Sequence, residues 1–516
     1  MTEELVNWSG SLRFTPGRIE RPTSEEELSR IVRRAAAEEK TVRPIGSMHT
    51  SSPIFVTDDI LVSLAHLRGV ASYDPGQSEA TVLPGTPLHV LGDALHAHGL
   101  AVPNLGDIDV QQVAGAIATG THGTGRSMQS LSCMLVGGRL LTAAGEIMAF
   151  SIEEDPEFVR AVRVSLGTLG IFTALRLRLL SAYDLRRREW CTTIDRCCLH
   201  LEDLIAENRN FDFYWYPRSD TVKLRTWNRP GEGPDDIPYA TLVEDRTGPA
   251  HRMLSKSRSL KFHEMEYALP AKTGYECFER VRTAVLEKHR RNVGWRVLYR
   301  TVAPDDSCLS VASGRPTVTI SLHQNATLPF WDYFRDIEPI FVEYGGRPHW
   351  AKKHTLKADD LRPLYPEWDR FRKIRRQMDP GGVFMTPAGG RRMKPIGRTL
   401  WVVPGGHIPL YSTGKEPRCT SNDSLSVLNA TDRDAHLQIT IFYTDRDPVG
   451  PYPLDVAAER VRNFRFNDLI NPEAMPLDTD YAAVIESDVP VVVQFSRQDT
   501  GRAENAICTT MAFPGE

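Results

Sequence analysis

The chain has 516 residues, of which 41% are hydrophobic and 25% are charged. These are ordinary values for a globular protein, and they exclude a largely disordered chain, a fibre and a coiled-coil rod. The 62 Lys and Arg residues against 66 Asp and Glu leave a net charge of −4 without a long run of one sign. Nucleic-acid binding driven by bulk charge is therefore not expected, and the length predicts roughly three domains.

The N-terminal sequence MTEELVNWSG has no basic segment followed by an apolar stretch, and no segment approaches 18 uninterrupted apolar residues. We therefore expect a cytoplasmic protein that does not enter a membrane. None of the eight cysteines stands in a CxxC pair, and the adjacent Cys197 and Cys198 match no zinc or redox pattern. We expect free thiols in a reducing compartment and no metal site.

The first block of the chain, residues 1–178, alternates helix and strand patterns. A helix is predicted over Glu26–Glu39, where apolar side chains recur at helical spacing after a run of acidic residues. Strand patterns follow in TVRPIG, DDILVSL and EATVLPG, and two glycine-rich loops, Gly46–Ser52 and Gly115–Gly125, interrupt them. This pattern is typical of a nucleotide-binding layer.

The second block, residues 179–388, mixes strand patterns (WRVLYRTVA and PTVTISLH) with three helical ones. It predicts an α+β domain with an antiparallel sheet, and RPGEGPDD at residues 229–236 predicts an exposed loop. The helices are expected over Tyr275–Lys288, Trp331–Tyr344 and Leu361–Met378.

The composition changes after a linker at residues 389–397. Residues 437–443 and 489–495 alternate polar and apolar side chains, and turn sequences separate short strands. Only residues 455–460 are mildly helical. The third block, residues 398–516, therefore predicts an antiparallel β sandwich or jelly roll.

The loop that follows the strand pattern at Val42 contains Gly46, which permits a tight turn and close backbone approach. Ser47, Thr50 and Ser51 add hydroxyls to its run of backbone N–H groups. Such a loop can bind a pyrophosphate without cationic side chains, and the alternative is a plain turn.

The second loop, VAGAIATGTHGTG from Val113, crowds small residues into one stretch, which indicates that a ligand or another backbone lies against it. The ordered motifs GSMHTSS, PNLGDIDVQQVAGAIATGTHGTG, SLGTLGIFT, GGRPHWAKKHT and MDPGGVF resemble those of the aldonolactone and alditol oxidases. The resemblance covers residues 8–388. It implies an α+β flavoprotein of the vanillyl-alcohol-oxidase fold, with a PCMH-type FAD-binding domain (1–178) and a substrate (cap) domain (179–388).

The resemblance implies FAD attached covalently through His49, at the 8α-methyl group of the flavin. A neutral imidazole is a suitable nucleophile for such a bond, and noncovalent contact is the alternative. Asp109 departs from the serine that is frequent at its position, so an acid there could alter flavin contacts or the substrate pocket. The residues assigned to FAD besides His49 are Pro44, Ile45, Gly46, Ser47, Met48, Thr50, Ser51, Asp109, Ala114, Ile117, Thr121, His122, Gly123, Thr124, Gly167, Gly170 and Ile171.

On the substrate side, Arg300 matches the arginine of a family Glu-x-Arg strand, but Leu298 replaces the glutamate and leaves the specificity open. Lys352 matches a family lysine close to the reactive edge of the flavin, and a surface salt bridge is its alternative. His323 is a candidate acceptor for the hydroxyl proton or, alternatively, a hydrogen-bonded sheet histidine. His349 is expected near the same edge.

The implied reaction oxidises a carbinol of a sugar-derived lactone or polyol by hydride transfer to flavin N5. Arg300 and Lys352 would polarise the substrate oxygen, and dioxygen would reoxidise the flavin with formation of hydrogen peroxide. Two alternatives stay open. One is a dehydrogenase with another electron acceptor. The other is a flavin-binding sensory or ligand-binding protein with weak or no turnover, which Leu298 favours.

From Gly397 onward, the phrases GRTLWVVPGGHIP and VLNATDRDAHLQITIFYTDRDPVGPY resemble the sensory rhodopsin transducer proteins. The resemblance implies a jelly-roll-like sandwich that assembles as a tetramer. Several polar residues are candidates for a ligand site or, alternatively, for hydrogen bonds that fix loops. They are His407, Arg465, Asn467, Asp468, Asp480, Arg497 and Asp499.

Overall fold

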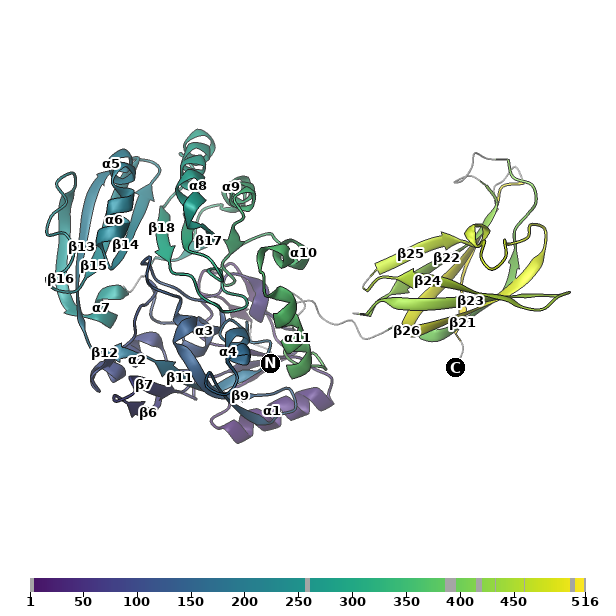
Figure 1. The fold of residues 1–516 in the computed structure, drawn as a ribbon, viewed down its shortest axis with the longest axis horizontal. Coiled ribbons are helices and arrows are strands. Elements are labelled where there is room, and N and C mark those ends of the chain that lie inside the picture. Colours follow the sequence, from purple (N-terminus) through teal and green to yellow (C-terminus); the bar gives the residue numbers. More distant parts are fainter. Residues whose placement is uncertain are drawn as a thin grey trace. The chain divides into compact units, whose positions relative to one another are not determined.

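The computed structural model describes residues 4–255, 260–385, 396–413, 420–431, 433–458, 460–501 and 506–514. The chain forms two compact units, Met1–Gly390 and Arg391–Glu516, whose elements are labelled in Figure 1. Most of the predicted linker (389–397) lies outside the described residues. None of the helices in these ranges is long and apolar enough to cross a membrane. The seven described cysteines are free, as predicted, and Cys419 lies outside the described residues.

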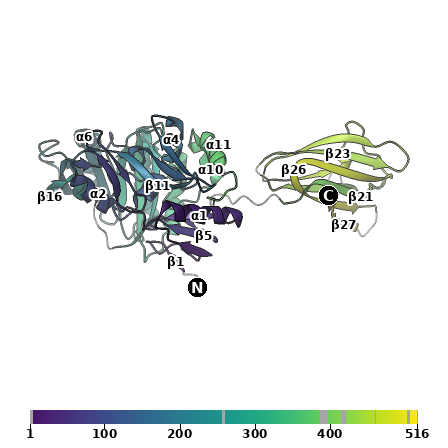
Figure 2. The ribbon, with the colours of Figure 1, turned by 90° about the horizontal axis from the view of Figure 1, so that it is seen from below.

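The first unit begins with a small parallel sheet covered by one helix. In helix α1 (Glu25–Ala37), the Ser24 side chain accepts a hydrogen bond from the Glu27 N–H and so caps the N-terminus. The apolar face of α1 packs against this sheet, and Figure 2 shows α1 beside β5. The helix predicted over Glu26–Glu39 is confirmed to within two residues at its end. The strands, in sheet order, are β3 (Arg18–Glu20), β5 (Ile60–Ser63) and β4 (Val42–Ile45).

A five-stranded antiparallel sheet and three helices complete this layer. In sheet order its strands are β10 (Ile147–Ser151), β9 (Leu135–Leu141), β11 (Ile171–Arg178), β7 (Glu79–Val82) and β6 (Val70–Asp74). The helices are α2 (Leu88–His96), α3 (Val113–Ala118) and α4 (Pro156–Val162), and 3-10 turns lie at Pro53–Phe55 and Leu131–Met134. Two-stranded pairs join β1 (Leu5–Val6) to β2 (Arg13–Phe14) and β8 (Leu100–Ala101) to β12 (Leu180–Ser181).

An eight-stranded sheet dominates the rest of the first unit, and all its neighbouring strands are antiparallel, as predicted. In sheet order its strands are β16 (Thr241–Pro249), β13 (Asp184–Thr193), β15 (Thr221–Asn228), β14 (Asn210–Tyr216), β18 (Val297–Val302), β19 (Thr317–Asn325), β17 (Phe262–Pro270) and β20 (Arg347–Pro348). Its helices are α5 (Ile194–Leu199), α6 (Leu201–Glu207), α7 (Ala250–Leu254), α8 (Ala271–Ala284), which continues as a π-helical turn to His289, and α9 (Trp331–Glu343). The helices predicted from Tyr275 and Trp331 are confirmed.

The two faces of this sheet differ in chemistry because side chains alternate along each strand. On β17, Met265 and Tyr267 belong to the apolar core that α5, α6, α8 and α9 close, and Figure 1 shows these helices along the sheet. The intervening Glu264 and Glu266 are on the opposite face, where they line a cavity. The sheet thus presents a polar face for a site and an apolar face for stability.

The chain then returns to the first layer. Instead of the single helix predicted over Leu361–Met378, it forms α10 (Ala358–Leu361), a 3-10 turn (Arg362–Leu364) and α11 (Trp368–Met378). The prediction was wrong because Pro363 lies inside the range, and proline lacks the N–H that an α-helix interior needs. Beyond α11, the Val383 carbonyl accepts a hydrogen bond of 2.7 Å from the N–H of Val42 on β4.

The second unit consists of two groups of strands that share the 20-residue strand β26 (Asp480–Asp499). One group has the order β24-β23-β26-β21-β28, and in the other β26 pairs with β22 and β27, and β22 with β25. The predicted alternation is confirmed, whereas the helix at 455–460 is wrong, because β24 ends and β25 begins there. The jelly-roll connection stays a prediction. The remaining strands are β21 (Arg398–His407), β22 (Asn422–Asn429), β23 (Ala435–Tyr443), β24 (Val449–Val456), β25 (Arg460–Arg465), β27 (Ala506–Met511) and β28 (Phe513–Pro514).

Candidate active site

A cavity with about 870 Å³ of empty space lies between the loop that follows β4, helix α3 and the segment before β11. Its walls are mostly small or apolar. Eleven of the residues predicted to bind FAD line it: Pro44, Ile45, Gly46, Ser47, Met48, His49, Thr50, Ala114, Gly167, Gly170 and Ile171. The two glycine-rich loops of the sequence therefore meet at one cavity.

The backbone around this cavity is held in an unusual conformation. Gly170 has a φ of +149°, and a Cβ there would lie 2.6 Å from the carbonyl oxygen of Leu141, so no other residue fits without displacement. Met48 adopts a φ of +52°, which is uncommon for a residue with a side chain. Positions of this kind cluster at ligand sites.

The loop offers backbone donors rather than cationic side chains. Within the described part of the chain, the amide N–H groups of residues 47–50 donate no hydrogen bond to another protein group. Arg43 is a buried cationic residue of this cavity. Its guanidinium donates to the carbonyls of Leu166, Gly167, Ile54 and Phe384, so it links the segments that form the cavity walls. Apolar walls suit a flavin ring and free amides suit a pyrophosphate, so these residues fit FAD.

A second cavity, with about 790 Å³ of empty space, lies over the polar face of the eight-stranded sheet. His49 and Gln111 line both cavities, so the two meet at these side chains. The sequence-predicted Ser51, Thr121, His122, Arg300, His323, His349 and Lys352 line the second cavity. A cofactor in the first cavity and a small molecule in the second would therefore share one boundary.

Glu264 on β17 joins two of the predicted catalytic residues. Its carboxylate oxygens lie 2.5 Å from Lys352 Nζ and 3.4 Å from His323 Nε2. Burial alone would raise the pKa of the Glu264 carboxyl, but the charge of Lys352 and the contact with His323 hold this pKa far below its ordinary range. Burial lowers the pKa of His323, although Glu264 acts in the opposite direction. The cavity thus contains an ion pair beside a neutral imidazole.

Glu266, two residues further along β17, binds Arg300. Both of its carboxylate oxygens accept from Arg300 Nη2, at 3.0 and 2.9 Å, and Oε1 lies 2.7 Å from His122 Nε2. Strand β19 lies between β18, which carries Arg300, and β17, which carries Glu266. The Arg300 side chain therefore crosses β19 at Thr319 and Ser321, whose side chains are small. Burial would raise the pKa of Glu266, but Arg300 and His122 hold it well below its usual value.

Two histidines that line the second cavity, His49 and His349, are neutral at pH 7. Burial lowers the pKa of His49 to about 4, and the positive charge of Lys352 contributes. Burial lowers the pKa of His349 to about 3. The His49 ring stacks on Trp8, with 5.0 Å between the ring centroids. A neutral, oriented imidazole therefore lies where the two cavities meet.

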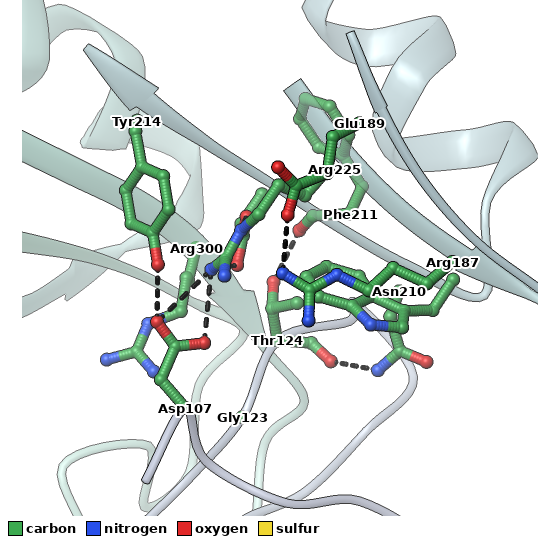
Figure 3. Close-up of polar contacts among 12 residues, drawn as sticks. Asp107, Gly123, Thr124, Arg187, Glu189, Asn210, Phe211, Tyr214, Arg225 and Arg300 are labelled. Atoms are coloured by element: carbon green, nitrogen blue, oxygen red, sulfur yellow. Dashed lines mark hydrogen bonds and ion pairs between the residues drawn. The ribbon is translucent and has the colours of Figure 1, made fainter. Parts of the chain in front are cut away.

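The loop after β8 brings a third carboxylate, Asp107, to the second cavity (Figure 3). Tyr214 on β14 donates its hydroxyl to Asp107 Oδ2 at 2.5 Å, and Arg225 on β15 donates Nη2 at 3.1 Å to Oδ1. Arg225 is itself held by two hydrogen bonds of 2.6 Å to Asp212. The Asp107 side chain is 22% exposed, compared with 1% for Glu266, so its carboxylate is the more accessible of the two.

Four predicted flavin residues lie apart from both cavities. Gly123 and Thr124 line a smaller one with Arg300, where the Thr124 hydroxyl donates to the Phe211 carbonyl (Figure 3). Ile117 is part of the apolar core. Asp109 accepts from the Ser255 hydroxyl at 2.8 Å. The acid of this loop that lines the second cavity is thus Asp107, two residues before the position we singled out.

Glu264, Glu266 and Asp107 also line the second cavity and were not predicted from the sequence. A signal was present in FHEMEYALP (262–270), where glutamates at 264 and 266 alternate with apolar side chains and so share one face of a strand. Asp107 gave no comparable signal, because its position in a loop has no periodicity. No group of side chains suited to a metal ion occurs in the described ranges.

In the second unit, the candidate ligand residues bind one another or their neighbours. Arg497 pairs with the buried Asp423 at 2.9 Å, His407 Nδ1 lies 2.8 Å from Asp480, and Arg465 pairs with Asp468 at 2.6 Å. The Asn467 amide donates to the Ser421 carbonyl, and Asp499 accepts from the Gly501 N–H. These contacts agree with the alternative that such residues fix loops.

Three protein families match the chain in order: "FAD binding domain" over residues 16–151, "D-arabinono-1,4-lactone oxidase" over 239–391 and "Anabaena sensory rhodopsin transducer" over 396–514. L-gulono-1,4-lactone dehydrogenase of Mycobacterium tuberculosis is 34% identical over 429 residues, which cover 75% of this chain and 99% of that protein. The chain belongs to the FAD-linked aldonolactone oxidase family. It carries a sensory rhodopsin transducer domain at its C-terminal end.

Other relatives in this family have different names. Alditol oxidase of a Streptomyces species is 29% identical (74% of this chain, 97% of the relative), and L-gulonolactone oxidase of Mus musculus is 26% identical (74% and 96%). Among solved structures, cholesterol oxidase from B. sterolicum superposes with a TM-score of 0.64 at 17% identity, over 75% of this chain and 96% of that one. This last similarity shows the flavoprotein oxidase fold alone.

Proposed function

We propose that this protein is an FAD-dependent oxidoreductase that oxidises a CH–OH group of a sugar-derived lactone or polyol. The observation that carries the proposal is the junction of the two cavities at His49 and Gln111, with the Lys352–Glu264 and Arg300–Glu266 pairs lining the substrate side. When bound, FAD supplies the acceptor for the hydride that leaves the carbon of the substrate.

The protein's own residues bind and polarise the substrate oxygen in this proposal. The Lys352 ammonium and the Arg300 guanidinium stabilise negative charge that develops on that oxygen. His323, neutral at pH 7, accepts the hydroxyl proton. Arg300 and Lys352 are both paired with buried carboxylates, so the cavity is adapted to a hydroxyl-rich neutral molecule rather than to an anion.

Anaerobic mixing of the purified yellow protein with aldonolactones, alditols and hydroxy acids tests this function. We expect bleaching of the flavin absorbance by a lactone or an alditol, and slower bleaching in Lys352→Ala with flavin binding retained. An intact flavin spectrum with every member of the panel would refute the proposal. It would favour the flavin-binding sensory or ligand-binding alternative, to which the transducer domain lends support.

Dioxygen is the electron acceptor that we propose, with hydrogen peroxide as its product. Among the relatives described above, the alditol and L-gulonolactone enzymes are named oxidases and the mycobacterial one a dehydrogenase. Peroxide formed in air in proportion to substrate would support an oxidase. Turnover only with an added dye would support a dehydrogenase.

Two finer features belong to the same proposal. Covalent attachment of FAD through His49 is supported by the neutral imidazole at the junction of the cavities. Assembly as a tetramer through the C-terminal domain is supported by its family match over residues 396–514. Light scattering that gives the mass of one 57.9 kDa chain would contradict the assembly.

A further inference from the structure

Glu264 connects groups that reach the substrate cavity from different parts of the fold. It stands directly opposite His323 in the β17–β19 register and contacts Lys352, which follows β20 in the chain. The Glu264 side chain is 8% exposed and that of Lys352 is 23% exposed. The ammonium is therefore the accessible member of the pair, and the carboxylate is the enclosed one.

The other groups around this ammonium do not balance its charge. Burial lowers the pKa values of His49, His323 and His349, and the positive charge of Lys352 acts in the same direction, so these rings are neutral at pH 7. Arg296 also lines the cavity and adds positive charge. The other two carboxylates of this cavity have partners of their own: Glu266 is bound by Arg300 and His122, and Asp107 by Arg225 and Tyr214. Glu264 is thus the carboxylate in contact with Lys352.

We propose that Glu264 is a positioning residue that fixes both the place and the charge of the Lys352 ammonium at the substrate oxygen. This inference rests on the proposed function, in which Lys352 binds that oxygen. A lysine is a point charge on a flexible four-carbon stem, so it needs a partner to hold one position. An ammonium enclosed without a counter-charge also loses its proton more easily, because burial disfavours the charged form.

Glu264→Gln tests the inference, since it keeps the shape of the side chain and removes its charge. Glu264→Asp restores the charge, and Asp245→Asn, in an exposed pair with Arg186 at the far edge of the sheet, is the matched control. In the FAD-loaded full chain, the rate of anaerobic flavin reduction should fall by about 10²-fold in Glu264→Gln, since small displacements of a polarising group have costs of this order. The remaining rate should also fall toward high pH, while Glu264→Asp and the control keep the original pH profile.

A second measurement does not depend on turnover. A neutral amine-reactive reagent modifies only unprotonated lysine, so mass spectrometry of Lys352 after brief acetylation at a series of pH values reports its protonation. We expect modification of Lys352 to begin at lower pH in Glu264→Gln than in the original chain, and the shift to be reversed in Glu264→Asp. An unchanged labelling curve, or equal curves for the Gln and Asp variants, would overturn the inference. If the labelling curve shifts but no substrate bleaches the original protein, the proposed function fails while the effect of Glu264 on the charge of Lys352 stands.

Discussion

Replacement of Glu266 by glutamine should destabilise the first unit by about 3–5 kcal/mol, the usual cost of leaving one member of a buried ion pair alone. The Glu266 side chain is 1% exposed and that of Arg300 is 9% exposed. The variant removes the negative charge that both Arg300 and His122 contact. Arg300 keeps its bond of 3.2 Å to the His122 carbonyl, so the guanidinium stays enclosed without its counter-charge.

Thermal unfolding measures this cost. A unit of 390 residues has an unfolding entropy of about 0.8 kcal/mol/K, so the Tm of Glu266→Gln should fall by about 4–6 °C. Asp245→Asn is the control, because its pair with Arg186 is exposed and contributes at most about 1 kcal/mol. A Tm loss for Glu266→Gln no larger than that of the control would refute the reasoning.

The pH dependence of this difference has a definite sign. Burial would raise the pKa of Glu266, but Arg300 and His122 hold it well below its usual value. A carboxyl whose pKa is lowered by folding stabilises the native state above its unfolded pKa of about 4.3, and this contribution is lost as the pH falls through the folded pKa. The Tm difference between the original chain and Glu266→Gln should therefore be constant from pH 6 to 8 and shrink in acid.

Three further outcomes are expected. An acid-precipitated pellet of the original chain should stay yellow, and a pellet of His49→Ala should be colourless, since the imidazole at the junction of the cavities is the proposed attachment point. A colourless pellet of the original chain would contradict this. Tyr214→Phe removes a donor to the Asp107 carboxylate while Arg225 still binds it, so steady-state kcat/KM should fall about tenfold. A kcat/KM equal to that of the original chain would contradict this expectation. A chain that ends at Gly390 should bind FAD and reduce it at the original rate, because the two units are separately compact; loss of flavin would show that they depend on each other.

The walls of the first cavity could be predicted to lie together from the sequence because they are continuous segments. The loop after β4 and the stretch at α3 each keep their cavity-lining residues together in the chain, so glycine and small residues reveal them locally. The two helix predictions that were wrong, at 361–378 and 455–460, were wrong for local reasons. Pro363 interrupts the first, and a change of strand occupies the second.

The second cavity was harder to predict because it depends on the order of strands in the sheet. β17 precedes β18 in the chain but lies beyond β19, so Glu264 and Glu266 meet His323 and Arg300 only through non-sequential pairing. Strand order is a long-range property that side-chain alternation within one strand does not contain. Alternation alone could have placed both glutamates on one face, but not above Arg300.

Leu298 shows what this difference means for specificity. Considered on its own strand, a leucine in place of a glutamate suggests a cavity that lacks a hydrogen-bond acceptor for substrate hydroxyls. In the sheet, Leu298 pairs with Tyr214 on β14 and with Ser321 on β19, and Tyr214 holds Asp107 in the wall of the same cavity. Asp107, Glu264 and Glu266 all line that cavity together with Leu298. The cavity is therefore rich in carboxylates even though position 298 carries a leucine, so that replacement alone does not remove hydrogen-bond acceptors from it.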